Sequence, residues 1–213
     1  MKLLAVAIVV SVSATAAADD LYSIGARVGG YGFRRAEDPG LLEGAAGDGW
    51  NVCRMNGFGV FADRNLAGPW FAEAALDTYF SIGQGESTDL PLDRESVLLS
   101  TAIGARAQFT SWLDGFVQVG AGVELTKLSV PWGDDSIRAD KVYPDAFAGL
   151  GFDIRIARGT FLGASLRALV MANFNYQMPM MTNQWVSAPS PDDVFAATPS
   201  LAAQGQFFLR RDL

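Results

Sequence analysis

The sequence predicts an all-β fold, an eight-stranded antiparallel up-and-down transmembrane β-barrel. Three observations lead to this prediction. First, eight runs of roughly ten residues or more alternate apolar residues with glycine or polar ones, and a period of two is typical of strands. Second, the segments between these runs are alternately long and short. Third, glycine or charge interrupts every apolar run of the mature chain, so none approaches the ~20 residues of a membrane helix.

The clearest pair of strands lies in the middle of the chain, at residues 97–109 and 115–128. Each run places aliphatic residues on one face and mainly glycine, alanine or polar residues on the other. Only the five residues TSWLD separate the two runs, which predicts an antiparallel hairpin. The aliphatic face comprises Val97, Leu99, Ile103, Val117, Val119, Val123 and Leu125.

The other six runs repeat the pattern of this hairpin along the chain. Each has roughly ten residues or more, the length that a tilted membrane strand needs. The second run has the least distinct faces, with Phe58 and Val60 expected opposite Met55 and Phe61. The eight predicted strands span residues 21–31, 51–63, 70–80, 97–109, 115–128, 142–156, 161–171 and 198–209.

The connections fix the expected topology. Because the number of strands is even, both chain ends return to one side of the barrel, and the three short turns lie on that side. The long loops then lie together on the opposite side, as in membrane barrels with short periplasmic turns and long external loops. The predicted long loops are about 32–50, 81–95, 129–141 and 172–197, and the short turns are 64–69, 110–114 and 157–160.

The first eighteen residues read as a signal peptide that is removed on export. Lys2 supplies a positive charge, residues 3–12 form a short apolar core, and three alanines precede the expected cleavage point. The mature chain, residues 19–213, is expected to be one domain. Its lone Cys53 cannot form an internal disulfide. The net charge of −7 argues against a nucleic-acid partner, which calls for a basic surface.

The two faces of the strands indicate which side meets lipid. A soluble barrel that binds a hydrophobic ligand would turn its aliphatic face inward and present bulky polar residues to water. Here the second face is rich in glycine, which suits the narrow interior of an eight-stranded barrel, so the aliphatic face is expected to contact outer-membrane lipid. These glycines are Gly25, Gly29, Gly104, Gly120, Gly122, Gly149, Gly151 and Gly163.

In strand pattern and topology the mature chain resembles the small outer-membrane β-barrels of Gram-negative bacteria, the OmpA/OmpX/OmpW-like group. The resemblance covers residues 21–209 and rests on no signature string. It implies insertion into the outer membrane by the barrel-assembly machinery, which in this family reads a terminal aromatic residue. Here Phe207 and Phe208 are followed by five further residues, so the aromatic is present but not terminal.

No histidine occurs in the chain, which removes Ser-His and Cys-His nucleophilic pairs and the commonest metal ligand. The enzymes known among outer-membrane barrels, such as lipid A deacylases and omptin-like proteases, depend on histidine. A carboxylate pair such as Asp145 with Asp153 remains conceivable, but acids that face arginines in a barrel interior are more often structural. We therefore expect no enzyme activity, no cofactor and no metal site.

Charged residues of both signs are expected on the interior face. Because an unpaired buried charge is costly, these residues should pair in the narrow lumen. The pairs could form a salt-bridged plug that stiffens the barrel, or they could line a gated polar path. The predicted lumen charges are Arg27, Glu73, Asp77, Arg106, Glu124, Asp145, Asp153, Arg155 and Arg167.

The longest loop, 172–197, gathers apolar and aromatic residues, and exposed clusters of this kind often mark binding sites. The alternative is that these residues pack on one another above the bilayer or belong to its interfacial aromatic belt. The cluster consists of Phe174, Tyr176, Met178, Met180, Met181 and Trp185.

Together these features predict a non-enzymatic outer-membrane barrel with a structural or adhesive role, in which the external loops bind a partner such as a surface protein. A second interpretation is a small transporter or pore for an apolar or small polar solute, as OmpW-like members are thought to be. A third is a soluble exported barrel that binds a hydrophobic ligand.

Overall fold

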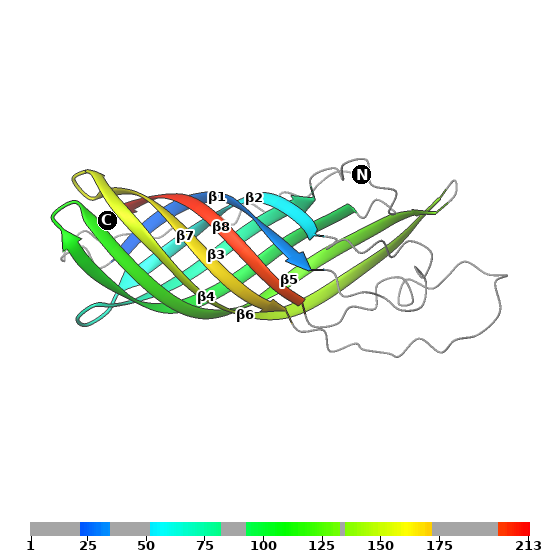
Figure 1. Ribbon diagram of the computed structural model, residues 1–213, viewed down its shortest axis with the longest axis horizontal. Helices are drawn as coiled ribbons and strands as arrows, with labels where there is room; N and C mark the ends of the chain where they lie inside the picture. The colour runs from blue at the N-terminus through cyan, green and yellow to red at the C-terminus, as the bar shows by residue number, and fades with distance from the viewer. Residues whose placement is uncertain (1–21, 35–51, 82–92, 133–134, 172–199) are drawn as a thin grey trace.

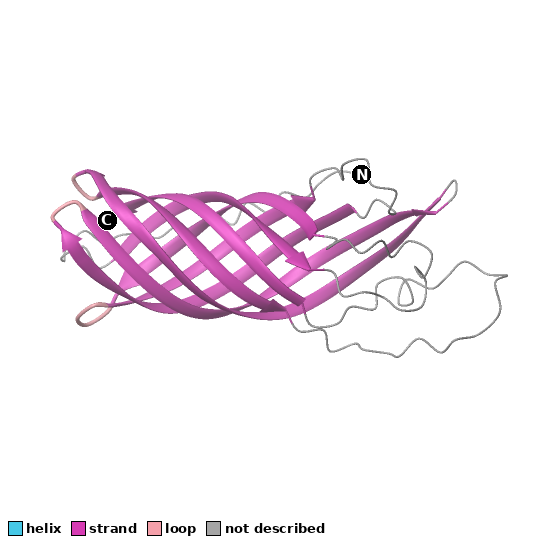
Figure 2. Ribbon diagram, in the orientation of Figure 1, coloured by secondary structure: helices cyan, strands magenta, loops and turns pink. Residues whose placement is uncertain are grey.

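The computed structural model describes residues 22–34, 52–81, 93–132, 135–171 and 200–213, and their regular elements are eight β-strands (Figures 1 and 2). Each strand pairs antiparallel with the next, and β1 pairs with β8, so the sheet closes as the predicted eight-stranded barrel. Within these residues no helix could cross a membrane. The strands are β1 (Tyr22–Arg34), β2 (Val52–Asn65), β3 (Trp70–Ser81), β4 (Asp93–Thr110), β5 (Leu113–Trp132), β6 (Asp135–Ala157), β7 (Thr160–Met171) and β8 (Ser200–Asp212).

One predicted loop is wrong. The segment 129–141 is strand except for residues 133–134, which lie outside the described part of the chain. The sequence here keeps β-branched residues, and Val130 pairs with Ile137 in the continued β5–β6 ladder. A hairpin ladder needs only two strands, so pairing continues after the neighbouring strands have ended.

Two other strand ends also differ from the prediction. β4 begins at Asp93, inside the predicted loop 81–95, and β8 continues to Asp212. The predicted signal peptide 1–18 and the predicted loop 172–197 lie wholly outside the described residues. So do residues 35–50 of the predicted loop 32–50 and residues 82–92 of the predicted loop 81–95.

The three short turns form for local reasons. Gly68 and Gly159 have φ values of 70° and 65°, in the left-handed region that glycine enters without steric cost. The turn between β4 and β5 has no glycine, and there the Thr110 hydroxyl accepts the backbone N–H of Trp112 at 3.3 Å and of Leu113 at 3.1 Å. The three short connections lie together at one end of the barrel, which we call the short-turn end (Figure 1).

The predicted facing of the strands is confirmed. Val119 and Leu166 are 57% and 56% exposed, and the least distinct strand also turns Phe58 and Val60 outward. The outer surface is thus a continuous aliphatic and aromatic belt, as in barrels that contact lipid. Its most exposed members include Val28, Phe58, Val60, Leu99, Val117, Val119, Leu125, Leu150, Leu166 and Phe207.

Glycine on the inner face makes room for phenylalanine rings from neighbouring strands. A Cβ added to any of five interior glycines would overlap the ring of a lumen phenylalanine. Most of these rings form an aromatic cluster toward the short-turn end, in which Phe61 and Phe208 pack edge to face with centroids 5.8 Å apart. The pairs are Gly25 with Phe61, Gly104 with Phe71, Gly120 with Phe147, Gly151 with Phe116, and Gly163 with Phe208.

We predict that Leu166→Arg, on the outer surface, lowers the free energy of unfolding by about 2–4 kcal/mol if the residue lies near the bilayer midplane, because the charge must enter hydrocarbon. Urea unfolding of protein folded in lipid vesicles measures this. Leu166→Met, which keeps an apolar side chain of similar size, serves as the control. Equal stability of the two variants would contradict the lipid-facing assignment.

We predict that Gly120→Ala lowers the free energy of unfolding by about 1–3 kcal/mol, because the added methyl group overlaps the Phe147 ring and the Thr101 carbonyl oxygen. Gly205 is the matched control, since no heavy atom lies within 4 Å of a Cβ added there. Gly205→Ala should therefore be close to neutral in the same urea titration. A similar loss in both variants would contradict the explanation by ring packing.

Candidate functional site

Arg27 of β1 is the centre of the charge network inside the barrel. Its Nε donates to Asp77 Oδ1 at 2.6 Å, its Nη2 also bonds Asp77, and its Nη1 donates to Glu73 Oε1 at 2.9 Å. Gly59 of β2 lies between Arg27 and Asp77 in the ladder and has no side chain to separate them. The glycine thus permits a bidentate ion pair between strands that are not neighbours.

Arg167 of β7 links this pair to the opposite wall. Its Nη2 lies 2.7 Å from Glu73 Oε1, so Glu73 accepts hydrogen bonds from two arginines. Its guanidinium also stacks over the Phe147 ring at 4.7 Å, and the Gln118 amide can accept from it at 2.7–2.8 Å. The polar contacts that cross the middle of the lumen therefore come from four strands, β1, β3, β5 and β7.

A second group of charges lies toward the short-turn end. Arg106 approaches Asp63 at 3.6 Å and Asp153 at 3.5 Å, and Arg210 lies 3.0 Å from Asp153. Asp63 and Arg210 are absent from the predicted set. Asp63 is two residues after Phe61 and therefore shares the inner face of β2, so alternation could have identified it as a lumen charge. Arg210 lies beyond the predicted end of the last strand.

A third group lies toward the long-loop end, the end opposite the short turns. Arg94 Nη2 lies 2.6 Å from Glu124 Oε1, which also accepts the Thr126 hydroxyl at 2.7 Å. Ser96 and Thr126 hydroxyls are 3.0 Å apart. The sequence predicts that Arg94 lies in the loop 81–95, so the predicted lumen charges lack this partner of Glu124.

One predicted member, Arg155, does not lie in the buried network. Arg155 lies near the end of β6, next to a register shift between β6 and β7. Its side chain is exposed, and its guanidinium carbon lies 5.3 Å from the Phe161 ring centroid. Its ladder partner Phe161 is buried, so Arg155 lies on a strand position that alternation assigns to the inner face, but its own side chain reaches solvent. A second predicted member, Asp145, is buried and forms no ion pair with any described residue.

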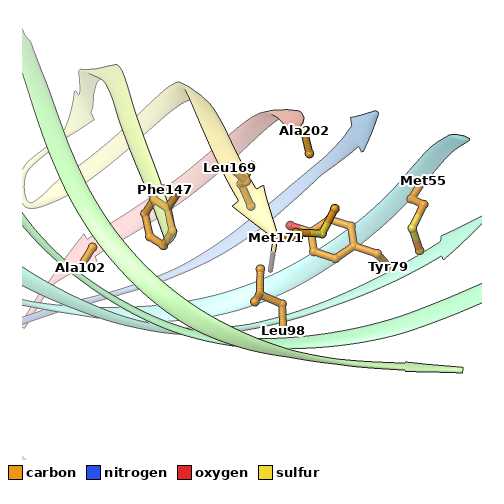
Figure 3. Packing of buried hydrophobic residues seen from close by; sticks show 8 residues of the cluster. All are labelled: Met55, Tyr79, Leu98, Ala102, Phe147, Leu169, Met171 and Ala202. Carbon is orange, nitrogen blue, oxygen red and sulfur yellow. The ribbon is translucent and has the colours of Figure 1, made fainter. Parts of the chain in front are cut away.

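Little space remains between these side chains. A cavity of about 20 Å³ lies among Arg27, Glu73, Arg167 and the aromatic cluster, which is room for about one water molecule. Toward the long-loop end an apolar cluster from six strands fills the interior, and the Tyr79 hydroxyl within it accepts from Gln204 at 2.6 Å (Figure 3). We call this cluster the outer apolar cluster because it lies inside the barrel toward the long-loop end, and it consists of Met55, Tyr79, Leu98, Ala102, Phe147, Leu169, Met171 and Ala202.

Outside the barrel, the ends of β5 and β6 form a projecting hairpin (Figure 1). The pairing of β6 with β7 begins only at Asp145 with Met171, and the pairing of β4 with β5 ends at Asp93 with Ser129. Residues 135–144 of β6 therefore pair with β5 on one side and with no described strand on the other. We call this stretch the free edge.

The apolar cluster predicted as a loop binding site, with Met178 and Trp185 among its members, lies wholly outside the described residues. Within the part of the chain that the structure describes, no group of three or more acids or cysteines could hold a metal ion.

We predict that Arg27→Met lowers the free energy of unfolding by about 3–5 kcal/mol, because Asp77 would remain buried without its cation. Arg64 is the control, since it is exposed and only stacks over Tyr22 at 5.5 Å. Arg64→Met should change stability by less than about 0.5 kcal/mol. Urea unfolding in vesicles compares the two, and equal effects would remove the energetic role of the network.

We also expect wild-type protein in planar bilayers to show little or no steady conductance, because packed side chains fill the lumen. Large ion-selective currents from the wild type would contradict this and favour the transporter interpretation.

No model of a known protein family matches the sequence, and no curated protein matches it. Solved structures match the fold. Neisserial surface protein A matches with a TM-score of 0.59 and 9% identity, covering 90% of this chain and 97% of its own. Ail, the attachment invasion locus protein of Yersinia pestis, matches with a TM-score of 0.50 and 14% identity, covering 90% and 98%. The chain has the fold of the small eight-stranded outer-membrane barrels of Gram-negative bacteria.

Proposed function

We propose that the protein is a non-enzymatic outer-membrane barrel that binds a partner protein at the cell surface, with the free edge of β6 as its binding element. The observation that carries this proposal is the ladder itself. Along residues 135–144, the backbone N–H and C=O groups that point away from β5 are used by no described strand. An extended segment of another protein can add to such an edge through backbone hydrogen bonds.

The chemistry of the free edge suits binding more than uncontrolled aggregation. Ten strand residues extend over about 33 Å, long enough for a stable added strand. Charged residues of both signs, Asp135, Arg138, Asp140 and Lys141, interrupt the edge, and charges of this kind protect natural edges from indiscriminate pairing. The binding would therefore favour a segment whose charges complement these four.

The membrane placement supports the same role. The aliphatic belt faces lipid, and the packed lumen leaves the external end as the part of the barrel that can meet a partner. Insertion would depend on the barrel-assembly machinery, and export on the predicted signal peptide. The name of Ail refers to attachment and invasion, a surface role of the kind proposed here.

To test the proposal, residues 128–139 are replaced by Asn-Gly between the ladder partners Lys127 and Asp140, which shortens the hairpin with a turn suited to two-residue connections. Cells that display the wild type should attach to immobilised extracellular-matrix proteins or to one another more than cells without it. The shortened variant should reach the surface at the same level and lose this attachment.

The control variant replaces Met178, Met180, Met181 and Trp185 with serine and keeps the hairpin. It should retain attachment. Loss of attachment in this variant but not in the shortened one would move the binding site to the loop 172–197. If cells that display the wild type attach no better than cells without the protein, the partner-binding role is rejected.

A further inference from the structure

Asp145 is the exception among the charges inside the barrel. Its side chain is 6% exposed, and no described side chain donates a hydrogen bond to either carboxylate oxygen. Five other interior carboxylates, whose side chains are at most 9% exposed, each lie within 4.0 Å of an arginine nitrogen. These five are Asp63, Glu73, Asp77, Glu124 and Asp153.

The surroundings of Asp145 are mostly apolar. It stands opposite Gly122 on β5 and Met171 on β7, and a Cβ added to Gly122 would contact both Asp145 Oδ1 and Leu98. Leu98, Met171 and Phe147 belong to the outer apolar cluster of Figure 3. The backbone of Gly122 is the weak polar neighbour of the carboxylate. An ionised carboxylate in such a place is costly without a cation.

Among the described side chains, the charged groups that face Asp145 do not balance it. Glu124 on β5 carries the same sign. Arg167 on β7 is bound to Glu73 and stacked on Phe147, and Arg94 on β4 is bound to Glu124. The basic residues whose side chains are not described are Lys2, Arg34, Arg35, Arg54, Arg138 and Lys141, and Lys141 lies four residues before Asp145 on β6.

We propose that Asp145 binds one positive charge from solution, as a proton or as an alkali cation. A single charge matches the single unpaired carboxylate, whereas a divalent ion would leave an excess positive charge in the apolar cluster. Met171, opposite Asp145, is the last residue of β7, so the site lies near the long-loop end and takes its charge from the external side.

The test compares the wild type with Asp145→Asn, which keeps the shape and removes the charge, and with Asp140→Asn, an exposed acid on the same strand. Urea unfolding in vesicles is followed in two series. In the first, pH rises from roughly 5 to 8 with a large organic cation as the only salt. In the second, pH is fixed and Na⁺ or K⁺ replaces the organic cation. Asp145→Ser is the second variant if the asparagine form does not fold.

If the charge is a proton, the native state holds one more proton than the unfolded chain above the ordinary titration range of a carboxyl group. Stability then falls as pH rises, and the unfolding constant of the wild type increases by up to about tenfold per pH unit relative to Asp145→Asn. If the charge is an alkali cation, the unfolding constant falls by up to about tenfold for each tenfold rise in Na⁺ or K⁺.

Either dependence supports the proposal when Asp145→Asn lacks it and Asp140→Asn keeps it. Parallel behaviour of the wild type and Asp145→Asn in both series would overturn it, because Asp145 would then bind no charge from solution.

Discussion

The narrow lumen of an eight-stranded barrel is the constraint on which the rest of this structure depends. Closing eight strands leaves an interior just wide enough for side chains, so whatever the strands turn inward must fit there completely. Two packing arrangements fill this interior. Phenylalanine rings lie over glycines of adjacent strands, and arginines reach carboxylates across a neighbouring glycine, as Arg27 reaches Asp77 across Gly59.

This constraint joins packing and electrostatics. The same missing side chains that let the rings approach the wall also let charged groups from non-adjacent strands meet. An arginine such as Arg167 serves both purposes, because it stacks on Phe147 and pairs with Glu73. A buried pair of this kind contributes little net stability compared with apolar packing, but losing one partner is costly, because the other charge is left buried and unpaired.

Alternation along the chain was enough to predict the strand number, the topology and the direction of nearly every described side chain, because each strand has one face in lipid and one in a crowded interior. Strand ends were less predictable. They depend on whether a neighbouring strand supplies a ladder partner, which one strand's own sequence does not reveal. For that reason the sequence predicts a loop at 129–141, places Arg94 in a loop and Glu124 in a strand, and ends the last strand before Arg210. The prediction for Arg155 is wrong for a different reason. Alternation tells which face of the strand a residue occupies, but not how far along the barrel it lies or whether its side chain is buried.

The unbroken course of β6 from the projecting hairpin to the short-turn end has a mechanical consequence. A partner strand added along the free edge would pull nearly parallel to β6, so the load would act in shear on many hydrogen bonds at once. Pulling at right angles would instead open such a ladder one bond at a time. The hairpin would therefore hold best under drag along its own axis, and the barrel wall, anchored in lipid on the outside and packed within, would carry that tension into the membrane.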